Sequence, residues 1–440
     1  MNRLLLAATC LAAGPLAAQD RDPATDAFAV IPEAPSSAFV DATATKMPLA
    51  SSLHATDSAM LDADNDGDLD VVLSVEYGVN RLYLNEGGTL SYQPDAFGTV
   101  MHDSEHVRTA DFDGDRNADV VSVAESDEVS QLFLGDGQGG FTDASDRLPR
   151  MGQANGLALG DLNGDGLPDI FIGSTGEVDH GASIVPARNI LFLNDSHNPG
   201  HFIDATDSHL PATDDQTEGV ALADMDNDGD LDVVIASPSH PNRLLLNDGS
   251  GVFTDASDRL DLPVPMETRE VHVFDANGDG WNDIVFFSIT SNNQGWEKDP
   301  QTRLLINDGE GRFSDETAER LPKHTFSSWA GTVVDFNRDG APDLLVGAIQ
   351  VPGFVPLQLR AWQNDGDGGF TDVTGDVVPG ITVGRSWSMS QGDLDGDGHP
   401  DVVIDGWGTQ ARLLLSDIAG FEAALPPMPS LPAPAPEVAR

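Results

Sequence analysis

The sequence predicts an all-β fold, a seven-bladed β-propeller whose blades are four-stranded antiparallel sheets. The first observation is self-similarity, because an Asp-rich pattern of nine residues occurs seven times at intervals of 49 to 63 residues. The second is that short, mostly apolar runs flank each pattern, and the third is that a Gly-rich turn follows in most units. A four-stranded unit repeated around an axis leaves few exposed sheet edges. The seven patterns start at Asp62, Asp111, Asp161, Asp224, Asp275, Asp335 and Asp393.

Each unit contains four runs that are short enough to be strands. In the fourth unit, the small and apolar run Gly219 to Ala223 precedes the pattern and the β-branched run Val233 to Ile235 follows it. Runs of this length and composition are typical of buried strands rather than helices. A third run, Arg243 to Asn247, is separated by a turn from a fourth run that starts near Phe253. An open solenoid is the alternative, but the β content, the unit length and the number of units favour a closed ring.

Two segments compete for the strand that closes the ring. Residues 39–43 resemble a fourth strand and precede the first pattern, so they would pair into the last blade and join the two ends of the chain. Phe421 also begins a segment of this kind within the last blade. The sequence leaves this choice open, and we assign the propeller to residues 39–424.

The ends of the chain lie outside the repeat. Residues 1–18 have the positive charge, the short apolar run and the small residues of a secretory signal peptide, and this run is too short to span a bilayer. Residues 19–38 are expected to form a linker, and residues 425–440 a Pro-rich extended tail. The single cysteine, Cys10, lies in the signal, so the mature chain would have no disulfide and no catalytic thiol. We expect a secreted, periplasmic or cell-surface protein without a transmembrane segment.

The charge of the chain excludes two classes of partner. The sequence has 73 acidic and 22 basic residues, which gives a formal net charge of -51. Such a surface repels nucleic acid and anionic membranes. Many of the Asp residues sit at fixed spacing, which a merely solvated acidic surface does not explain.

Each Asp-rich pattern predicts a calcium loop. Asp or Asn side chains supply oxygen at positions 1, 3, 5 and 9, and position 7 can add its backbone carbonyl. Ca²⁺ takes six to eight such oxygen ligands, whereas Mg²⁺ demands a small octahedral cage and is the second choice. Carboxylates this close repel one another without a cation, so we expect up to seven Ca²⁺ ions. The predicted ligand residues are Asp62, Asp64, Asp66, Asp68, Asp70, Asp111, Asp113, Asp115, Asn117, Asp119, Asp161, Asn163, Asp165, Leu167, Asp169, Asp224, Asp226, Asp228, Asp230, Asp232, Asp275, Asn277, Asp279, Trp281, Asp283, Asp335, Asn337, Asp339, Ala341, Asp343, Asp393, Asp395, Asp397, His399 and Asp401.

These loops differ from an EF-hand at their closing end. An EF-hand has a bidentate Glu at position 12 and helices on both sides. Here position 12 is Ser122 in the second pattern and an apolar residue in the others, and the flanks are strands, so the Asp at position 9 is expected to close the site. Position 6 is glycine except in the second loop, where Arg116 stands. A left-handed backbone disfavours a side chain there, so the second loop is expected to be the weakest or most distorted.

The combined motif resembles a known family. An Asp-x-Asp/Asn-x-Asp-Gly-x-x-Asp loop between two strands, with Asn-Asp-Gly-x-Gly-x-Phe later in the unit, resembles the FG-GAP/VCBS repeats of integrin-α-like propellers over roughly residues 39–424. The resemblance implies that the calcium loops lie on one face and that ligands bind on the opposite face. Because the family includes adhesion domains, lectins and carbohydrate-enzyme propellers, it does not fix the function.

One position of the repeat is expected to line the mouth of the central funnel. It lies six residues before each loop, where the inner strand begins. Polar and aromatic groups that converge there suit a sugar or peptide ligand. Ordinary lining of the funnel is the alternative. The position holds Thr56, Glu105, Asn155, Glu218, Arg269, Trp329 and Trp387, of which the last six are the candidate ligand-binding residues.

Three functions remain open at this point. The first is a non-enzymatic binding or adhesion module that recognises a glycan or an extracellular protein through the funnel face. The second is a carbohydrate-active enzyme, a polysaccharide lyase or hydrolase. The third is a structural surface protein without a small ligand. We assign no catalytic residue, because no clear set of acid, base and stabilising group emerges. The enzyme hypothesis would draw on Glu105, His106, Glu218, Arg269 and Glu270.

Overall fold

The structure of the chain is a computed structural model, and it is all-β. The signal peptide, nearly all of the linker, Phe421 and the tail predicted from the sequence lie outside the residues that it describes. Within those residues the helices are single turns, and none is long and apolar enough to cross a membrane. The described residues are 38–48, 53–150, 152–178, 184–185, 187–239, 241–262, 266–289, 302–351, 355–384 and 386–417.

Seven sheets of four antiparallel strands dominate the described part of the chain, and each is called a blade below. Blade 1 is β2 (Ala55–Leu61), β3 (Asp70–Val75), β4 (Arg81–Asn85) and β5 (Leu90–Gln93), paired in that order. The next two blades are β6 (Ser104–Ala110), β7 (Asp119–Ala124), β8 (Gln131–Gly135) and β9 (Phe141–Asp143), and β10 (Ala154–Gly160), β11 (Asp169–Ser174), β14 (Ile190–Asn194) and β15 (Phe202–Asp204).

The remaining blades repeat the same order. Blade 4 is β16 (Gly219–Ala223), β17 (Asp232–Ala236), β18 (Arg243–Asn247) and β19 (Phe253–Asp255), and blade 5 is β20 (Thr268–Phe274), β21 (Asp283–Ser288), β22 (Arg303–Asn307) and β23 (Phe313–Asp315). Blade 6 is β24 (Gly331–Val334), β25 (Asp343–Val346), β28 (Arg360–Asn364) and β29 (Phe370–Asp372), and blade 7 is β31 (Ser386–Gly392), β32 (Asp401–Gly406), β33 (Arg412–Ser416) and β1 (Phe39–Asp41).

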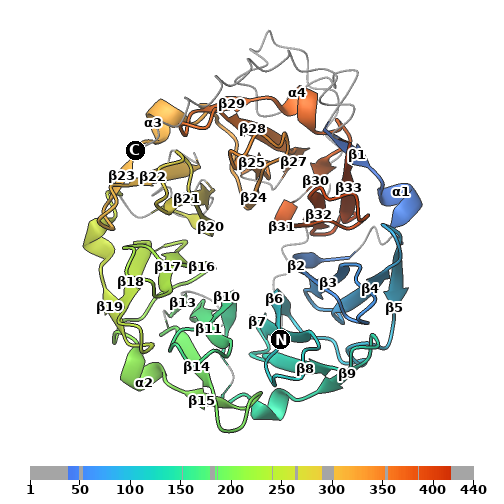
Figure 1. Cartoon of the computed structure of the whole chain (residues 1–440), viewed down its shortest axis with the longest axis vertical. Coiled ribbons are helices and arrows are strands. Elements are labelled where there is room, and N and C mark those ends of the chain that lie inside the picture. Colours follow the sequence, from blue (N-terminus) through green and yellow to red (C-terminus); the bar gives the residue numbers. More distant parts are fainter. Residues whose placement is uncertain are drawn as a thin grey trace, which may run out of the picture.

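The blades stand around a central axis in a propeller-like arrangement, with the first strand of each innermost (Figure 1). Single helical turns follow most fourth strands at the rim. They are α1 (Thr43–Lys46), α2 (Thr206–His209), α3 (Thr317–Arg320) and α4 (Thr374–Val377), with the 3₁₀ turns Ser145–Arg147 and Ser257–Arg259.

The N-terminal strand β1 completes blade 7. It pairs with β33 in antiparallel register, with Phe39 opposite Ser416. An ion pair between Arg412 and Asp41 at 3.0 Å supports the same contact. Of the two segments that the sequence left open, the structure therefore places residues 39–41 in the closing position.

The core lies between neighbouring blades. All six residues of β3 are buried, because both faces of this second strand pack against apolar side chains. Val72 and Leu82 of blade 1 pack with Val120 and Phe133 of blade 2 in one cluster. This packing on both faces explains why the second strands have continuous apolar runs rather than the alternation of a half-buried strand.

Two additional sheets depart from the repeat. The ribbon of β12 (Glu177–Val178) and β13 (Ile184–Val185) extends the connection between the second and third strands of blade 3. A three-stranded sheet is formed by β26 (Ile349–Gln350), β27 (Val355–Gln358) and β30 (Val383–Gly384) in the region of blades 6 and 7. The repeat pattern did not predict either sheet.

The closing strand gives a direct test of its contribution to stability. Phe39 is 1% exposed, whereas its neighbour Val40 is 47% exposed. We expect Phe39→Ala to lower the free energy of unfolding by about 3–5 kcal/mol, because it removes a fully buried ring at the joint of the two chain ends. Val40→Ala is the matched control and should change it by less than about 0.5 kcal/mol. Urea unfolding measures both, and equal effects would contradict the assigned role of β1.

Candidate functional site

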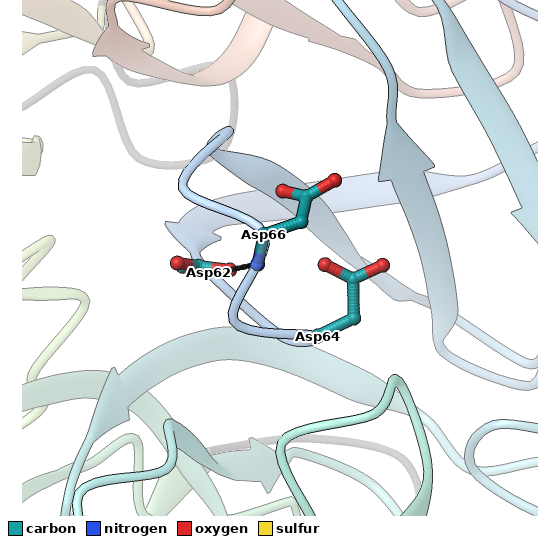
Figure 2. Close-up of side chains that lie close together, drawn as sticks. All are labelled: Asp62, Asp64 and Asp66. Atoms are coloured by element: carbon teal, nitrogen blue, oxygen red, sulfur yellow. Dashed lines mark hydrogen bonds between the residues drawn. The ribbon is translucent and has the colours of Figure 1, made fainter.

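The seven Asp-rich segments form tight loops between the first and second strands of the blades, and they are called the acidic loops below. In the first, three carboxylates arise from one turn (Figure 2). The Asp62 carboxylate accepts hydrogen bonds from the backbone N–H groups of Asp66 and Gly67, both at 3.2 Å. The Asp66 carboxylate accepts one from the Asp68 N–H at 2.9 Å. The turn thus fixes the side chains at positions 1 and 5 through its own backbone.

The other six loops repeat two of these three contacts. The carboxylate at position 1 accepts the N–H of position 6, and the carboxylate at position 5 accepts the N–H of position 7. The first contact joins Asp111 to Arg116, Asp161 to Gly166, Asp224 to Gly229, Asp275 to Gly280, Asp335 to Gly340 and Asp393 to Gly398 at 2.8–3.0 Å. The second places the position-7 residues Asn117, Leu167, Asp230, Trp281, Ala341 and His399 at 2.8–3.1 Å from the position-5 carboxylate.

The Asp at position 9 has a structural role that the sequence did not indicate. Asp70 is fully buried, and its two oxygens accept the N–H of Ala63 in the loop at 2.7 Å and the N–H of Asn85 on the third strand at 2.8 Å. The same pair of contacts recurs in all seven blades, through Asp119, Asp169, Asp232, Asp283, Asp343 and Asp401. Because a carboxylate oxygen has two lone pairs, these bonds leave capacity for a metal.

Burial makes these position-9 carboxylates costly to ionise. It raises the pKa of Asp70 to about 6 and that of Asp343 to about 8, although backbone hydrogen bonds partly oppose the shift and neighbouring loop carboxylates add to it. The ordinary pKa of an Asp is near 3.9. A bound cation would favour the ionised form of these groups.

The residues of the acidic loops fit a hard divalent cation. In two loops the set of close carboxylates includes position 9, namely Asp224 with Asp226 and Asp232, and Asp393 with Asp395 and Asp401. Three loops also contain a buried carboxylate oxygen without a hydrogen-bond donor. These oxygens belong to Asp64, Asp226 and Asp335. A buried polar atom without a partner is unfavourable, and a cation ligated by oxygen would satisfy it.

The loop backbone requires left-handed conformations at two positions, of which the sequence indicated one. Position 6 has a positive φ as predicted, including 75° at Arg116. Position 4 is also left-handed, with φ of 58° at Asn65, 63° at Asn227 and 61° at Arg338, and with glycine in the other loops. The Gly or Asn found at position 4 in six of the seven patterns was the available signal.

An Asn at the end of the third strand links neighbouring loops. The side-chain amide of Asn247 donates to the backbone oxygens of Leu231 in its own blade, at 3.1 Å, and of Leu162 in the loop of the preceding blade, at 2.8 Å. The equivalent bond to the preceding loop is made by Asn85, Asn194, Asn307 and Asn364. The acidic loops are therefore connected to one another along one face of the ring.

The opposite ends of the inner strands converge on one cavity of about 220 Å³. Five inner strands carry a β-bulge at the position six residues before the loop, where the Cα pairing register with the second strand shifts. A bulge re-aims a side chain out of the regular alternation. The bulged positions are Thr56, Glu105, Asn155, Arg269 and Trp387. With Glu218 and Trp329, which precede β16 and β24, all seven line this cavity.

The tryptophan rings of the cavity stack on one another. The rings of Trp329 and Trp387 stack at 4.2 Å between centroids, and those of Trp387 and Trp407 at 5.3 Å. The Arg269 guanidinium lies 4.4 Å from the Trp329 centroid, and the His54 ring lies 4.8 Å from that of Trp407. This column contributes to the wall of the cavity and spans blades 5, 6, 7 and 1, so it also ties the two ends of the ring together.

The rest of the cavity is acidic. Glu76, Glu105, Glu125, Glu218 and Glu270 line it. The Arg269 guanidinium is held by Glu218 at 2.9 Å and by Glu267 at 3.0 Å, and Asn155 donates to Glu218 at 3.1 Å. Burial and then the charges of other acids raise the pKa of Glu105 well above its ordinary value and that of Glu125 to about 7.

Three cavity residues were missed by the sequence reasoning. Glu76, Glu125 and Trp407 each follow a second strand and line the cavity beside the predicted position. All three occupy position 15, counted from the first Asp of the pattern. Their shared place at position 15 of the repeat was therefore the signal in the sequence that could have located them.

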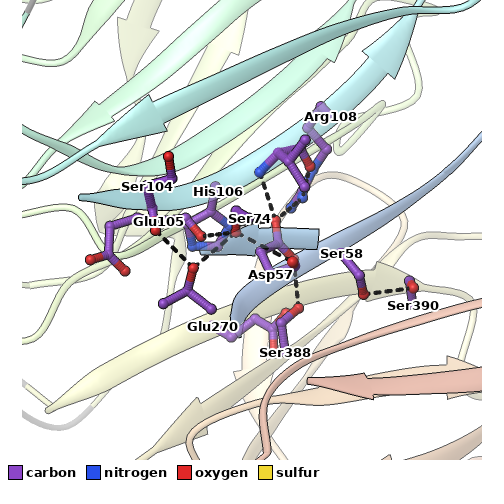
Figure 3. Close-up of polar contacts among 12 residues, drawn as sticks. Asp57, Ser58, Ser74, Ser104, Glu105, His106, Arg108, Glu270, Ser388 and Ser390 are labelled. Carbon is purple, nitrogen blue, oxygen red and sulfur yellow. Dashed lines mark hydrogen bonds and ion pairs between the residues drawn. The ribbon is translucent and has the colours of Figure 1, made fainter. Parts of the chain in front are cut away.

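His106 lines the same cavity, and a buried carboxylate holds its ring in place. Its Nδ1 lies 3.1 Å from the Asp57 carboxylate, which also contacts Arg108 and accepts the Ser388 hydroxyl at 2.7 Å (Figure 3). Burial alone would raise the pKa of Asp57, but the charges of Arg108 and His106 outweigh it and hold the pKa below its ordinary value. The residues named for the enzyme hypothesis, Glu105, His106, Glu218, Arg269 and Glu270, thus share one cavity.

Comparison with known proteins identifies the repeat. The FG-GAP-like repeat matches residues 62–122, 111–172, 224–286, 287–346 and 356–404, and all seven acidic loops lie within these segments. The chain belongs to the FG-GAP-like repeat family. The FG-GAP segments end before or begin after the β12–β13 ribbon, which agrees with its position as an addition to the repeat.

A relative shares part of this FG-GAP chain. Cartilage acidic protein 1 of Xenopus tropicalis is 29% identical over 201 residues, which is 43% of this chain and 28% of that protein. The chain therefore matches less than a third of the length of this relative.

The second acidic loop provides a test of the loop backbone. We expect Arg116→Gly to stabilise the protein by about 1 kcal/mol, because glycine removes the strain of a left-handed side chain although it also loosens the unfolded chain. Arg312→Gly is the control, because Arg312 is exposed beside a turn and is not among the residues with positive φ. That change should lower the stability. If both substitutions destabilise equally in urea unfolding, the strain at Arg116 is refuted.

Proposed function

We propose that this chain is an exported, calcium-binding seven-bladed propeller that binds a glycan or an extracellular protein in the cavity opposite the acidic loops. One observation carries the proposal: residues from all seven blades meet in a single acidic cavity. The fold does not require a β-bulge at the start of five inner strands. Their placement around one cavity supports a recognition site, which fits the extracellular, adhesion-like modules in which FG-GAP repeats occur.

The acidic loops are proposed to hold up to seven Ca²⁺ ions. Side-chain oxygens of positions 1, 3, 5 and 9 and the carbonyl of position 7 would supply the ligands. The bound ions would compensate the loop carboxylates and so stabilise the joints between strands. This proposal rests on the repeated loop geometry and on the unpartnered oxygens of Asp64, Asp226 and Asp335.

The size and charge of the cavity restrict the ligand. A volume of about 220 Å³ suits a single sugar unit or one side chain rather than a long segment of polymer. The carboxylates offer hydrogen-bond acceptors to hydroxyl or ammonium groups. Trp329, Trp387 and Trp407 stack on one another, so their ring faces are engaged with other rings. A ligand would therefore contact the edges of these rings rather than stack on their faces.

An enzyme is the second candidate, and the fixed histidine favours it. His106 contacts Asp57 through Nδ1 and lines the cavity beside Glu105 and Glu270. A histidine held by a carboxylate is a common general base, and a carboxylic acid with a raised pKa suits a general acid. A polysaccharide lyase or hydrolase would use this pair.

A ligand screen with calcium-loaded protein tests the proposal. We expect retention of one class of glycan or of one extracellular protein, and we expect Glu218→Gln to weaken it at least tenfold, which is about 1.4 kcal/mol. Glu218 holds both Arg269 and Asn155, whereas Glu319 is exposed outside the cavity, so Glu319→Gln is the matched control.

Other outcomes of the same screen would replace the proposal. Turnover of a polysaccharide that disappears in His106→Ala would establish the enzyme. Absence of both retention and turnover would leave a structural surface protein without a small ligand.

A further inference from the structure

Three carboxylates outside the acidic loops gather at the funnel, where blade 1 meets blade 2. Glu76 follows β3, Asp103 precedes β6, and Glu105 is the bulged residue of β6. Each offers one oxygen, and these oxygens all lie within 4.8 Å of one another. The cluster lies at the opposite end of the inner strands from the acidic loops, so it is separate from them.

Asp103 gives an independent indication that something binds there. This residue is only 2% exposed. One of its oxygens accepts the N–H of Ser126 at 3.0 Å, whereas Oδ1 has no hydrogen-bond donor. A buried carboxylate oxygen without a partner is unfavourable, and Asp103 belongs to a cluster of three carboxylates, which together indicate a ligand that accepts electron pairs.

Among the residues that the structure describes, no lysine or arginine forms an ion pair with this cluster. The Arg269 guanidinium is taken up by Glu218 and Glu267. The partners of Glu76 are the indole N–H of Trp407 and the His54 ring, whose Nδ1 lies 3.4 Å away. Within the described residues, these three carboxylates therefore have no arginine or lysine as an ion-pair partner.

We propose that Glu76, Asp103 and Glu105 bind a divalent metal ion, as a site additional to those of the acidic loops. Ca²⁺ binds oxygen at 2.3–2.6 Å, so any two of its ligands lie at most about 5 Å apart, and the oxygens of the cluster are within this limit. Protein oxygens would occupy one side of the ion. Glu76 and Glu105 line the cavity, so the other side faces the position of a ligand.

This site would define the class of ligand. Water or an oxygen-rich group would complete the coordination of the ion, such as neighbouring hydroxyls or a carboxylate of a glycan. An acidic cavity would otherwise repel a carboxylate. This part of the inference rests on the proposed function of the cavity, whereas the metal site itself does not.

Metal counting on the full chain tests the site. We expect the double variant Asp103→Asn/Glu105→Gln, equilibrated with Ca²⁺, to retain one ion fewer per chain than the wild-type protein. Glu128→Gln is the control that matches the single variant Glu76→Gln, because it removes one negative charge at an exposed residue nearby, and it should retain the full number. The single variant Glu76→Gln, which leaves the buried Asp103 unchanged, should also lose one ion. This second loss would show that misfolding of the double variant is not the cause.

A second readout reports on the cluster itself. Tb³⁺ bound there should luminesce on excitation of Trp407, whose indole N–H donates to Glu76. A Trp281→Phe background removes the tryptophan of the fifth acidic loop. In that background, the double variant should lose most of the sensitised emission, whereas Glu128→Gln should keep it.

The outcomes separate this inference from the proposed function. An unchanged ion count together with unchanged Tb³⁺ emission overturns the metal site, even if Glu218→Gln still abolishes ligand binding. An unchanged ion count with weaker binding of a lysine-containing peptide also overturns it, because the cluster would then hold an ammonium group. Loss of one ion in both variants supports the site, even if ligand binding in the cavity fails.

Discussion

The buried Asp at position 9 of each acidic loop is the constraint on which the rest of the structure depends. In every blade it joins three segments through two backbone N–H groups: the loop, the second strand and the end of the third strand. Hydrogen bonds donated to a charged acceptor are strong, but burying the charge is costly. The Asn that ends the third strand of most blades then bonds to the preceding loop. The position-9 carboxylate therefore holds the strands of its own blade together, and in most blades the Asn that it binds connects that blade to the preceding one.

The inner strands separate this scaffold from the cavity that is proposed to bind a ligand. Each leads from the cavity at its start to an acidic loop at its end, so the same strand serves both faces. The loop face is repetitive, because every loop must make the same turn. The cavity face is varied, because its bulged residues lie outside the regular strand register and range from Thr56 to Trp387. This division would allow one repeat to support different ligands, if the cavity binds one as proposed.

The sequence predicted the parts of the molecule that repeat. Seven copies of one spacing gave the loops, the strand order and the seven positions that meet in the cavity, because identical local chemistry produces identical local structure. It could not choose the closing strand, since Phe39 and Phe421 begin similar segments and the choice depends on packing across the whole ring. It also missed what only contacts reveal: the backbone bonds of Asp70, the stacking of the tryptophans, and the cluster around Asp103.

The central claim is that a divalent ion in the acidic loops stabilises the joints of the ring. Thermal unfolding of calcium-loaded protein and of the same protein after chelation and removal of the metal tests it most directly. A ligand that binds only the folded chain raises its stability, so the account predicts a strong fall in Tm on removal and recovery when Ca²⁺ is restored. An unchanged melting curve for protein shown to be free of metal would contradict it.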